Sequence, residues 1–248
     1  MRRLFPLLLA LLIGCEGMAL HEAELADSPE AYEAFLQEHP SSSEAARLRE
    51  RIEKLRFLQA KEGKDAASLQ KFLALHPDGE HAAEAKAMED TLAYEEIGKA
   101  GTAEQLQAYL DSHPDGEFVE DARGRVKKMQ YLPSMSVGEV TQERVNMAGD
   151  EKGELNGWKI TADVLNGGDK TLSVVEVGVD YLDSKGGVVQ TDTWWAVTKD
   201  LGGFPVPPWM LKALPKGQTR QFVFSTAERP AEFADQFAVR VTGVRFRE

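Results

Sequence analysis

The stretch FLQEHP at residues 35–40 recurs as FLALHP at 72–77 and as YLDSHP at 109–114. Each copy lies 37 residues after the one before it, and the same offset aligns further positions. The aligned columns are Ser28, Asp65 and Thr102; Tyr32, Leu69 and Leu106; Phe35, Phe72 and Tyr109; Leu36, Leu73 and Leu110; and Phe57, Tyr94 and Tyr131. A fixed period of this length is typical of a repeat architecture. The sequence therefore predicts three units, at residues 28–64, 65–101 and 102–132.

Each unit is predicted to form two helices. The first begins at the Ser28 column, whose side-chain oxygens can accept an early backbone N–H. It carries an apolar face at the spacing of Tyr32, Phe35 and Leu36, and it ends at the His-Pro because the residue before a proline disfavours helical backbone. The second helix is expected to end near Phe57, Tyr94 or Tyr131. Since one helical pair cannot bury its own apolar stripe, stacked pairs are expected to form a short α-solenoid.

The units resemble tetratricopeptide-like repeats of the kind found in periplasmic lipoproteins that assemble envelope complexes. The resemblance rests on the Phe-Leu-x-x-His-Pro segments and the small residues after them, and it covers residues 28–131. The period departs from the usual ~34 residues, and the Trp and Leu-Gly signature of that family is absent. The resemblance implies a protein-binding repeat, without naming a subfamily.

Residues 1–14 have the pattern of an export signal. Arg2 and Arg3 precede an apolar run from Leu4 to Ile13. This run is too short to cross a bilayer core, which needs ~20 helical residues. A removable signal is therefore favoured over a membrane span.

The four residues LIGC at 12–15 resemble the bacterial lipobox. The resemblance implies lipid attachment to the Cys15 thiol, cleavage before it, and membrane anchoring by several acyl chains. The alternative is an ordinary secretory signal with an incidental cysteine. Glu16, rather than aspartate, follows Cys15, which favours an outer-membrane lipoprotein facing the periplasm. Residues 15–27 are expected to form a tether.

The chain is acidic, with a formal net charge of −12. Residues 16–131 carry 25 acidic and 14 basic side chains, whereas residues 132–248 carry 16 and 13. Nucleic-acid binding needs clustered Lys and Arg, so no nucleic-acid partner is expected. Cys15 is the only cysteine, which excludes an internal disulfide.

Residues 133–248 are predicted to form a β domain. Composition shifts there toward Val, Thr, Gly and Trp, and turn sequences separate short alternating segments. The expected strands are 137–145, 159–164, 171–182, 188–197, 221–225 and 237–246. This number of strands favours an antiparallel β-sandwich. The whole chain is therefore expected to be an α+β multidomain protein.

The β domain resembles FxLYD-type immunoglobulin-like domains over residues 155–246. The resemblance rests on the order of the strands, the Asn-Gly turn at 166–167, the stretch VDYLD at 179–183, and Lys216-Gly217. Val179 replaces the initial Phe, and residues 198–214 are an insertion. The resemblance implies binding or scaffolding, and brings no catalytic residues.

One candidate ligand site lies in and beside this insertion. Trp194 and Trp195 are adjacent in a strand, so they should point to opposite faces of a sheet. Phe204 and Trp209 lie in the proline-rich loop that follows. These aromatics are interpreted either as a sugar-stacking or peptide-binding platform, or as a plug in which Trp195 lies in the core and Trp209 folds back.

The sequence holds no phosphate loop, nucleophile elbow, zinc-protease motif or dinucleotide fingerprint. The spacing of His76, Asp78 and His81 suggests metal ligands, but a histidine in the last turn of a repeated helix explains the pattern better. We therefore expect no catalytic residues, no metal and no cofactor. A hydrolase with an unfamiliar site stays open, and a cleft with several perturbed titratable groups would indicate it.

Two functions remain as hypotheses. The first is a non-catalytic, lipid-anchored scaffold or adaptor that binds an envelope protein. The alternative is a lipoprotein that binds cell-wall or surface polysaccharide through Trp194, Trp195 and Trp209.

Overall fold

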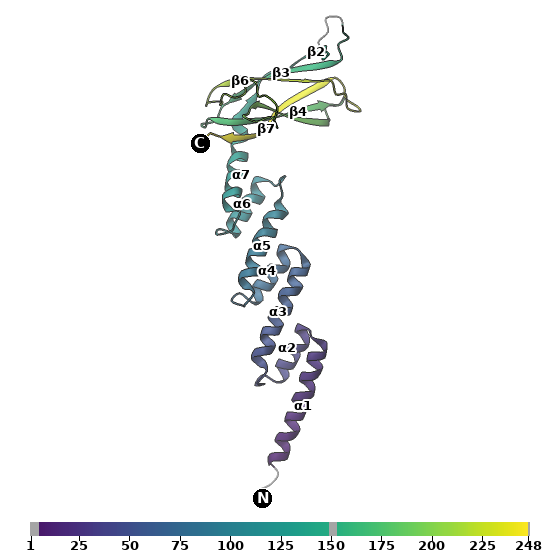
Figure 1. Ribbon diagram of the computed structural model, residues 1–248, viewed down its shortest axis with the longest axis vertical. Helices are drawn as coiled ribbons and strands as arrows, with labels where there is room; N and C mark the ends of the chain where they lie inside the picture. The colour runs from purple at the N-terminus through teal and green to yellow at the C-terminus, as the bar shows by residue number, and fades with distance from the viewer. Residues whose placement is uncertain (1–4, 149–152, 248) are drawn as a thin grey trace. The chain divides into compact units, whose positions relative to one another are not determined.

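The computed structural model describes the backbone of residues 5–148 and 153–247, and their side chains from residue 16 onward. The chain divides into two compact units, Met1–Ala122 and Arg123–Glu248. The first is helical and the second consists mainly of antiparallel strands, so the chain has a mixed α+β fold (Figure 1). Among the described residues, no helix combines the length and apolar character needed to cross a bilayer.

Helices make up the first unit, and the last of them continues into the second. Their bounds are α1 Phe5–Ala26, α2 Pro29–Glu38, α3 Ala45–Gly63, α4 Ala66–Leu75, α5 Ala82–Ile97, α6 Ala103–Ser112 and α7 Val119–Tyr131. The three predicted N-caps are confirmed: the side chains of Ser28, Asp65 and Thr102 accept backbone N–H groups at the starts of α2, α4 and α6. Thr102 also forms a capping box with Gln105.

The aligned apolar columns are the buried face of these helices. Tyr32, Leu69 and Leu106 are each at most 4% exposed, as are Phe35, Phe72 and Tyr109. Tyr32 and Phe35 share one apolar cluster with Leu48 and Ile52 of α3. Leu69 and Phe72 share the next with Phe57 of α3 and Ala85 of α5. Each pair of helices therefore completes its apolar core with side chains from a neighbouring helix or pair.

The predicted end of α3 is wrong. The helix continues past Phe57 to Gly63, and Lys64 then turns the chain with a positive φ of 53°. Phe57 packs against the rings of Phe72 and His81, at centroid distances of 5.5 and 4.7 Å. The Phe57 column therefore marks the contact with the following repeat, and it coincides with a helix end only at Tyr131.

The segment 15–27, expected as a tether, is helical up to Ala26 as part of α1. Ala23 is 4% exposed and lies in the cluster of Tyr32 and Phe35. Arg51 of α3 forms an ion pair with Asp27, just beyond the end of α1. The end of α1 therefore packs on the first repeat, because its Ala side chains fill the open face of α2 and α3.

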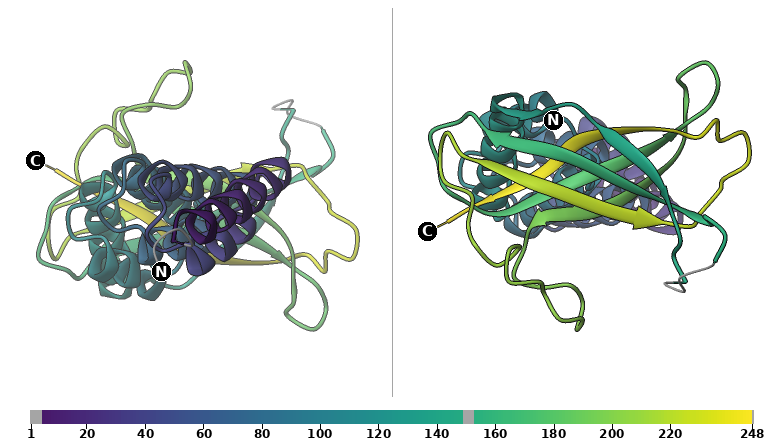
Figure 2. Two further views of the ribbon diagram at one scale, coloured as in Figure 1. Left: turned by 90° about the horizontal axis from the view of Figure 1, so that it is seen from below. Right: turned by 90° about the horizontal axis from the view of Figure 1, so that it is seen from above.

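The second unit contains two antiparallel sheets. Their strands are β1 Met135–Val137, β2 Thr141–Val145, β3 Gly157–Asn166, β4 Leu172–Leu182, β5 Val188–Val197, β6 Thr219–Thr226 and β7 Gln236–Phe246. In one sheet β3 pairs with β1, β2 and β6, and in the other β4 lies between β5 and β7. Figure 2 shows these strands in its right-hand view. The predicted first strand, 137–145, is interrupted after Val137 and resumes at Thr141.

One apolar core joins the two sheets. Ile160 and Val164 of β3 and Phe222 of β6 are fully buried with Val177 and Tyr181 of β4. Tyr181 is the tyrosine of the VDYLD stretch, and its hydroxyl donates to Asp192 at 2.6 Å. Burial and this carboxylate raise the pKa of Tyr181, so the phenol remains a donor.

The division between the units lies inside α7, after Ala122, and not at the predicted residue 133. The end of α7 packs on the sheets: Tyr131 meets the ring of Phe246 edge-on at 5.1 Å. Its hydroxyl donates to Asn166 at 2.8 Å. Pro133 lies in a short 3-10 helix directly after α7. The change in composition near residue 133 therefore comes several residues after the boundary between the two units.

Candidate functional site

A groove of about 700 Å³ lies between the second and third repeats. Its lining includes Gln70, Leu73, Lys86, Glu89, Asp90 and His113. A groove of about 580 Å³ lies between the first and second repeats, and its lining includes Glu33, Leu36, Arg49, Ile52, Glu53 and His76. Each residue of the second set lies 37 positions before its counterpart in the first. The repeat therefore builds the same groove twice.

The histidine of each repeat has a structural role at its helix end. His39, His76 and His113 are the C-cap residues of α2, α4 and α6, and each backbone N–H bonds the carbonyl four residues earlier. Each ring also packs on the aromatic ring four residues before it, at 4.7 to 5.2 Å. Packing and capping therefore account for the recurrence of His-Pro.

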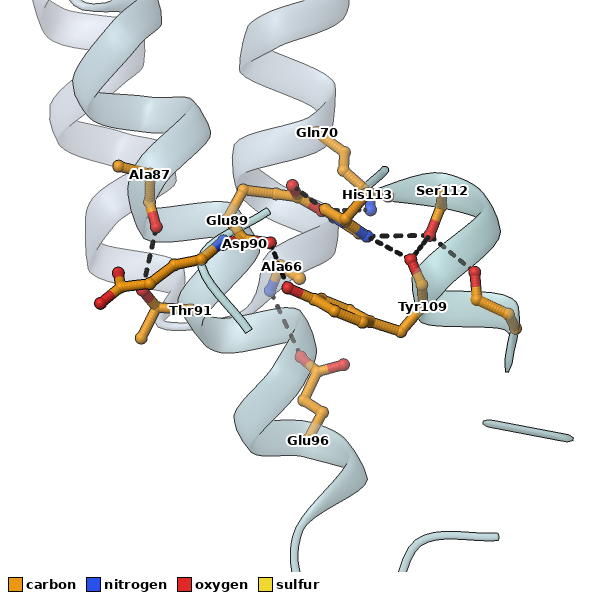
Figure 3. Close-up of polar contacts among 12 residues, drawn as sticks. Ala66, Gln70, Ala87, Glu89, Asp90, Thr91, Glu96, Tyr109, Ser112 and His113 are labelled. Carbon is orange, nitrogen blue, oxygen red and sulfur yellow. Dashed lines mark hydrogen bonds and ion pairs between the residues drawn. The ribbon is translucent and has the colours of Figure 1, made fainter. Parts of the chain in front are cut away.

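The second groove differs from the first by one buried acid. Glu89 stands where the first repeat has Ile52, and its side chain is only 6% exposed. Its carboxylate accepts hydrogen bonds from Gln70 at 2.6 Å and from His113 Nε2 at 2.9 Å (Figure 3). In the first groove His76 Nε2 is buried and, among the described residues, has no hydrogen-bond partner. Glu89 thus gives the second histidine the acceptor that the first lacks.

Asp90 holds the turn that borders this groove. Its carboxylate accepts the Tyr109 hydroxyl at 2.6 Å, as Figure 3 shows, and the backbone N–H of Glu117 at 2.8 Å. Burial and the bond to Asp90 raise the pKa of Tyr109. Glu53 holds the corresponding turn one repeat earlier, because its carboxylate accepts the backbone N–H of His81 at 2.9 Å. Each acid therefore fixes a turn of the next repeat.

Close approach explains the glycine of each Pro-Asp-Gly turn. A Cβ on Gly116 would lie 2.3 Å from Asp90 Oδ1, and one on Gly79 would lie 2.3 Å from Glu53 Oε1. Only a glycine leaves room for the carboxylate at this distance. Neither of the two has a positive φ.

The groups in the second groove form a chain from Ser112 through His113 to Glu89. Ser112 Oγ lies 2.8 Å from His113 Nδ1, the order found in nucleophile, base and acid relays. However, Ser112 Oγ also lies 2.9 Å from the carbonyl of Ala108 and 3.2 Å from that of Tyr109. These contacts are the ordinary back-bonding of a serine in the last turn of a helix. Helix termination and contact between repeats therefore account for this series of hydrogen-bonded groups.

The structure separates the four predicted aromatic site residues. Trp194 and Trp195 are both half-buried, with ring centroids 5.7 Å apart. Trp194 also packs 6.2 Å from Phe224 of β6, on the side of the core. Trp195 pairs with Glu176 on β4. The two rings are therefore in contact and do not lie on opposite faces of the sheet, so the predicted alternation is wrong here, and Trp194 rather than Trp195 packs on the core.

Phe204 and Trp209 lie on the connection between β5 and β6, which extends beyond the strands (Figure 2). They are 76% and 40% exposed. Met210, 1% exposed, is the residue that closes this connection onto the sheets, and its carbonyl accepts the N–H of Thr198 at 3.0 Å. The plug interpretation named Trp195 and Trp209, but the residue buried at this end of the connection is Met210, whose flexible thioether suits an irregular gap.

The predicted lipid attachment at Cys15 concerns a side chain outside the described residues. Of the suspected metal ligands, His81 packs on Phe57 and lies 3.4 Å from Glu53, whereas His76 packs on Phe72. Within the described part of the chain, no three His, Cys, Asp or Glu side chains gather as metal ligands.

The buried acids Glu89 and Asp90 were missed by the sequence reasoning. The available signal was an alignment of the repeats at every position. In that alignment Glu89 interrupts an otherwise apolar column of Ile52 and Val126. An acid in an apolar column predicts a buried partner, here the histidine of the next repeat.

No protein-family model and no curated protein matches the sequence. The solved structures with weak similarity include the following two. The structure of the structural-genomics target SoR45 is 11% identical with a TM-score of 0.22, over 46% of this chain and 86% of that one. The alkylpurine DNA glycosylase AlkC of Pseudomonas fluorescens, bound to DNA with an abasic-site analogue, is 13% identical with a TM-score of 0.25, over 89% of this chain and 51% of that one. Likenesses this low carry no argument about fold or function.

Proposed function

We propose that this protein is a lipid-anchored, non-catalytic adaptor of the bacterial cell envelope, which binds a partner protein through its helical repeats. The observation that carries the proposal is the groove built twice from residues 37 positions apart. A groove that recurs with the repeat suits an extended polypeptide. The proposal includes an α-solenoid for residues 28–132 and an immunoglobulin-like β-sandwich for the strands, and anchoring through Cys15 at the outer membrane.

Charge and apolar surface define the expected partner segment. The second groove is lined by Glu89, Asp90, Asp115 and Glu117 against one basic residue, Lys86. The first is lined by Glu33, Glu50 and Glu53 against Arg49. In each, a half-buried leucine, Leu36 or Leu73, lies beside the acids. The partner is therefore a segment that carries Lys or Arg with interspersed apolar side chains.

Site-specific crosslinking in cells tests this proposal. A photoreactive residue replaces Leu36 or Leu73 in the grooves, and the matched control is Leu58 of α3, which is 44% exposed and lines neither groove. Both groove positions should capture the same envelope protein through a Lys- or Arg-containing segment. Asp115→Lys should reduce capture at Leu73. Equal capture at Leu58, or capture that Asp115→Lys leaves unchanged, would contradict the proposal.

The anchor is tested separately. Cys15→Ser should move the protein from the envelope pellet to the soluble fraction, without changing the binding of the purified partner. A Cys15→Ser protein that still pellets with envelopes would refute lipid anchoring and leave the groove unaffected.

Polysaccharide binding is the second candidate, favoured by the exposure of Phe204 and Trp209 on one connection. Exposed aromatic faces stack on sugar rings. Adding a cell-wall glycan should then shift the tryptophan fluorescence of the wild-type protein and not that of Trp209→Ala. Identical shifts in both proteins, or none in either, would remove this candidate.

A further inference from the structure

The strand unit holds a second, differently charged pocket of about 550 Å³. Its lining includes three basic side chains, Lys199, Lys212 and Arg247, together with Thr171 and Ser173. No acidic side chain is among the described residues that line it. Acidic side chains outnumber basic ones in this protein, whose formal net charge is −12, so a pocket lined by three cations and no acid is unusual for it.

Several other cations of the same unit are paired with acids. Arg240 binds Asp180 at 2.8 Å, Lys159 binds Glu143 at 2.7 Å, and Arg229 binds Asp235 at 2.8 Å. Within the part of the chain that the structure describes, no ion pair involves a cation of the pocket. Three like charges that share a pocket repel one another, and a bound anion would relieve that repulsion.

The backbone at each cation is fixed by hydrogen bonds. The carbonyl of Lys212 accepts from Arg220 at 3.2 Å, and the N–H of Arg247 donates to Thr171 at 2.9 Å. Lys199 directly follows Thr198, whose N–H donates to Met210. The three side chains therefore start from held positions on two segments, the connection between β5 and β6 and the residue after β7, which reduces the entropy that a ligand must remove.

The remaining lining is apolar. Leu211, 46% exposed, lies in the pocket with Ala213 and Pro215. Leu214 beside them is fully buried and pairs with Leu172 across an isolated bridge, which holds this wall against β4. The pocket thus offers a charged side and a carbon-rich side, and its volume lies in the range of small-molecule sites.

We infer that this pocket binds a phosphate-bearing ligand, with the phosphate between Lys199, Lys212 and Arg247 and its carbon body against Leu211 and Pro215. A phosphomonoester carries a charge of about −1.5 to −2, which matches three cations better than a single carboxylate does. Lys supplies point charges and Arg a planar fork, both suited to phosphate oxygens. The ligand is a free phosphomonoester, or the phosphodiester headgroup of an anionic phospholipid, which carries one negative charge and presents the same kind of phosphate oxygens to the three cations.

Calorimetry on the full chain in a neutral detergent tests this inference and separates the two sources. The soluble probes are inorganic phosphate, glucose 6-phosphate and glucose, and the lipid probes are mixed micelles of the same detergent with phosphatidylglycerol or phosphatidylcholine. Binding of glucose 6-phosphate in preference to glucose indicates a soluble ester. Binding of the phosphatidylglycerol micelles alone indicates a headgroup. Binding should weaken as salt is added.

Substitutions assign the binding to the pocket. Lys199→Gln, Lys212→Gln and Arg247→Gln should each weaken it about fivefold, as expected for the loss of one exposed charge contact. The matched control is Lys185→Gln, an exposed lysine in the turn before β5. Unchanged tryptophan fluorescence in each variant would show that the strand unit is folded. No binding of any phosphate probe, or equal weakening by Lys185→Gln, would overturn the inference.

Discussion

The contact between Glu89 and His113 gives the sharpest prediction about the helical unit. The two side chains are 6% and 12% exposed and meet at 2.9 Å. Glu89→Leu removes the acceptor of His113 and recreates the first groove, where Ile52 takes this place. We expect a loss of about 2 kcal/mol, because a hydrogen bond to a charged group contributes roughly 1.5–3 kcal/mol and the added apolar side chain offsets part of it.

His113→Phe should cost more, about 3 kcal/mol, because it leaves the carboxylate of Glu89 buried without this partner. The double variant, Glu89→Leu with His113→Phe, should return to within about 1 kcal/mol of the wild type, since two apolar side chains replace the pair. The three variants thus form a double-mutant cycle whose coupling is well above the additive limit of roughly 0.5 kcal/mol.

Urea unfolding of the full chain, followed by two signals, measures these changes. All four tryptophans, at positions 158, 194, 195 and 209, belong to the strand unit, so fluorescence reports on that unit alone. Far-ultraviolet circular dichroism is dominated by the helices. Each single variant should lower the dichroism transition and leave the fluorescence transition in place.

The matched control is Glu84→Leu on the same helix. Glu84 pairs with Lys61 at 3.0 Å, but both side chains are about half exposed, so its loss should cost less than ~0.5 kcal/mol. The reasoning is refuted if Glu89→Leu changes stability no more than Glu84→Leu, or if the double variant loses the sum of the two single losses.

Three further predictions use the same two signals. Gly116→Ala should destabilise the helical unit by about 1–3 kcal/mol, since its Cβ would displace the Asp90 carboxylate; an unchanged dichroism transition would contradict the clash. Asp65→Ala should destabilise the same unit at neutral pH. The N–H of Ser68 lowers the pKa of Asp65 in the folded state, so the stabilisation is present above the unfolded pKa, and the difference from wild type should shrink as pH falls through the lower, folded value. Asn166→Ala should lower only the fluorescence transition, by about 3 kcal/mol. Its fully buried amide bonds two carbonyls and a phenol, and a shift confined to dichroism would refute this.

The sequence predicted most elements because their signals are local. The N-cap oxygens of Ser28 and Asp65 and the prolines after each histidine act within one turn of helix, so their spacing fixed where α2 and α4 begin and end. The alternation in β4 and β5 was equally clear, and their predicted and observed bounds differ by at most one residue.

The sequence could not predict which long-range partners these elements would meet. The column of Phe57 was visible, but only packing shows that it marks a contact with Phe72 and not a helix end. Likewise, Met210 rather than Trp209 closes the connection after β5, because the space available there is set by side chains of other strands.

For this protein, the sequence alone determined the period of 37 residues, the starts and stops of the repeated helices, and the alternation of the strands. Those features depend on residues a few positions apart. The tertiary structure decided that Glu89 is buried against His113 and that Lys199, Lys212 and Arg247 share one pocket. The physical reason is that burial and electrostatic contact depend on distances in space, which chain positions 24 or 48 residues apart do not specify.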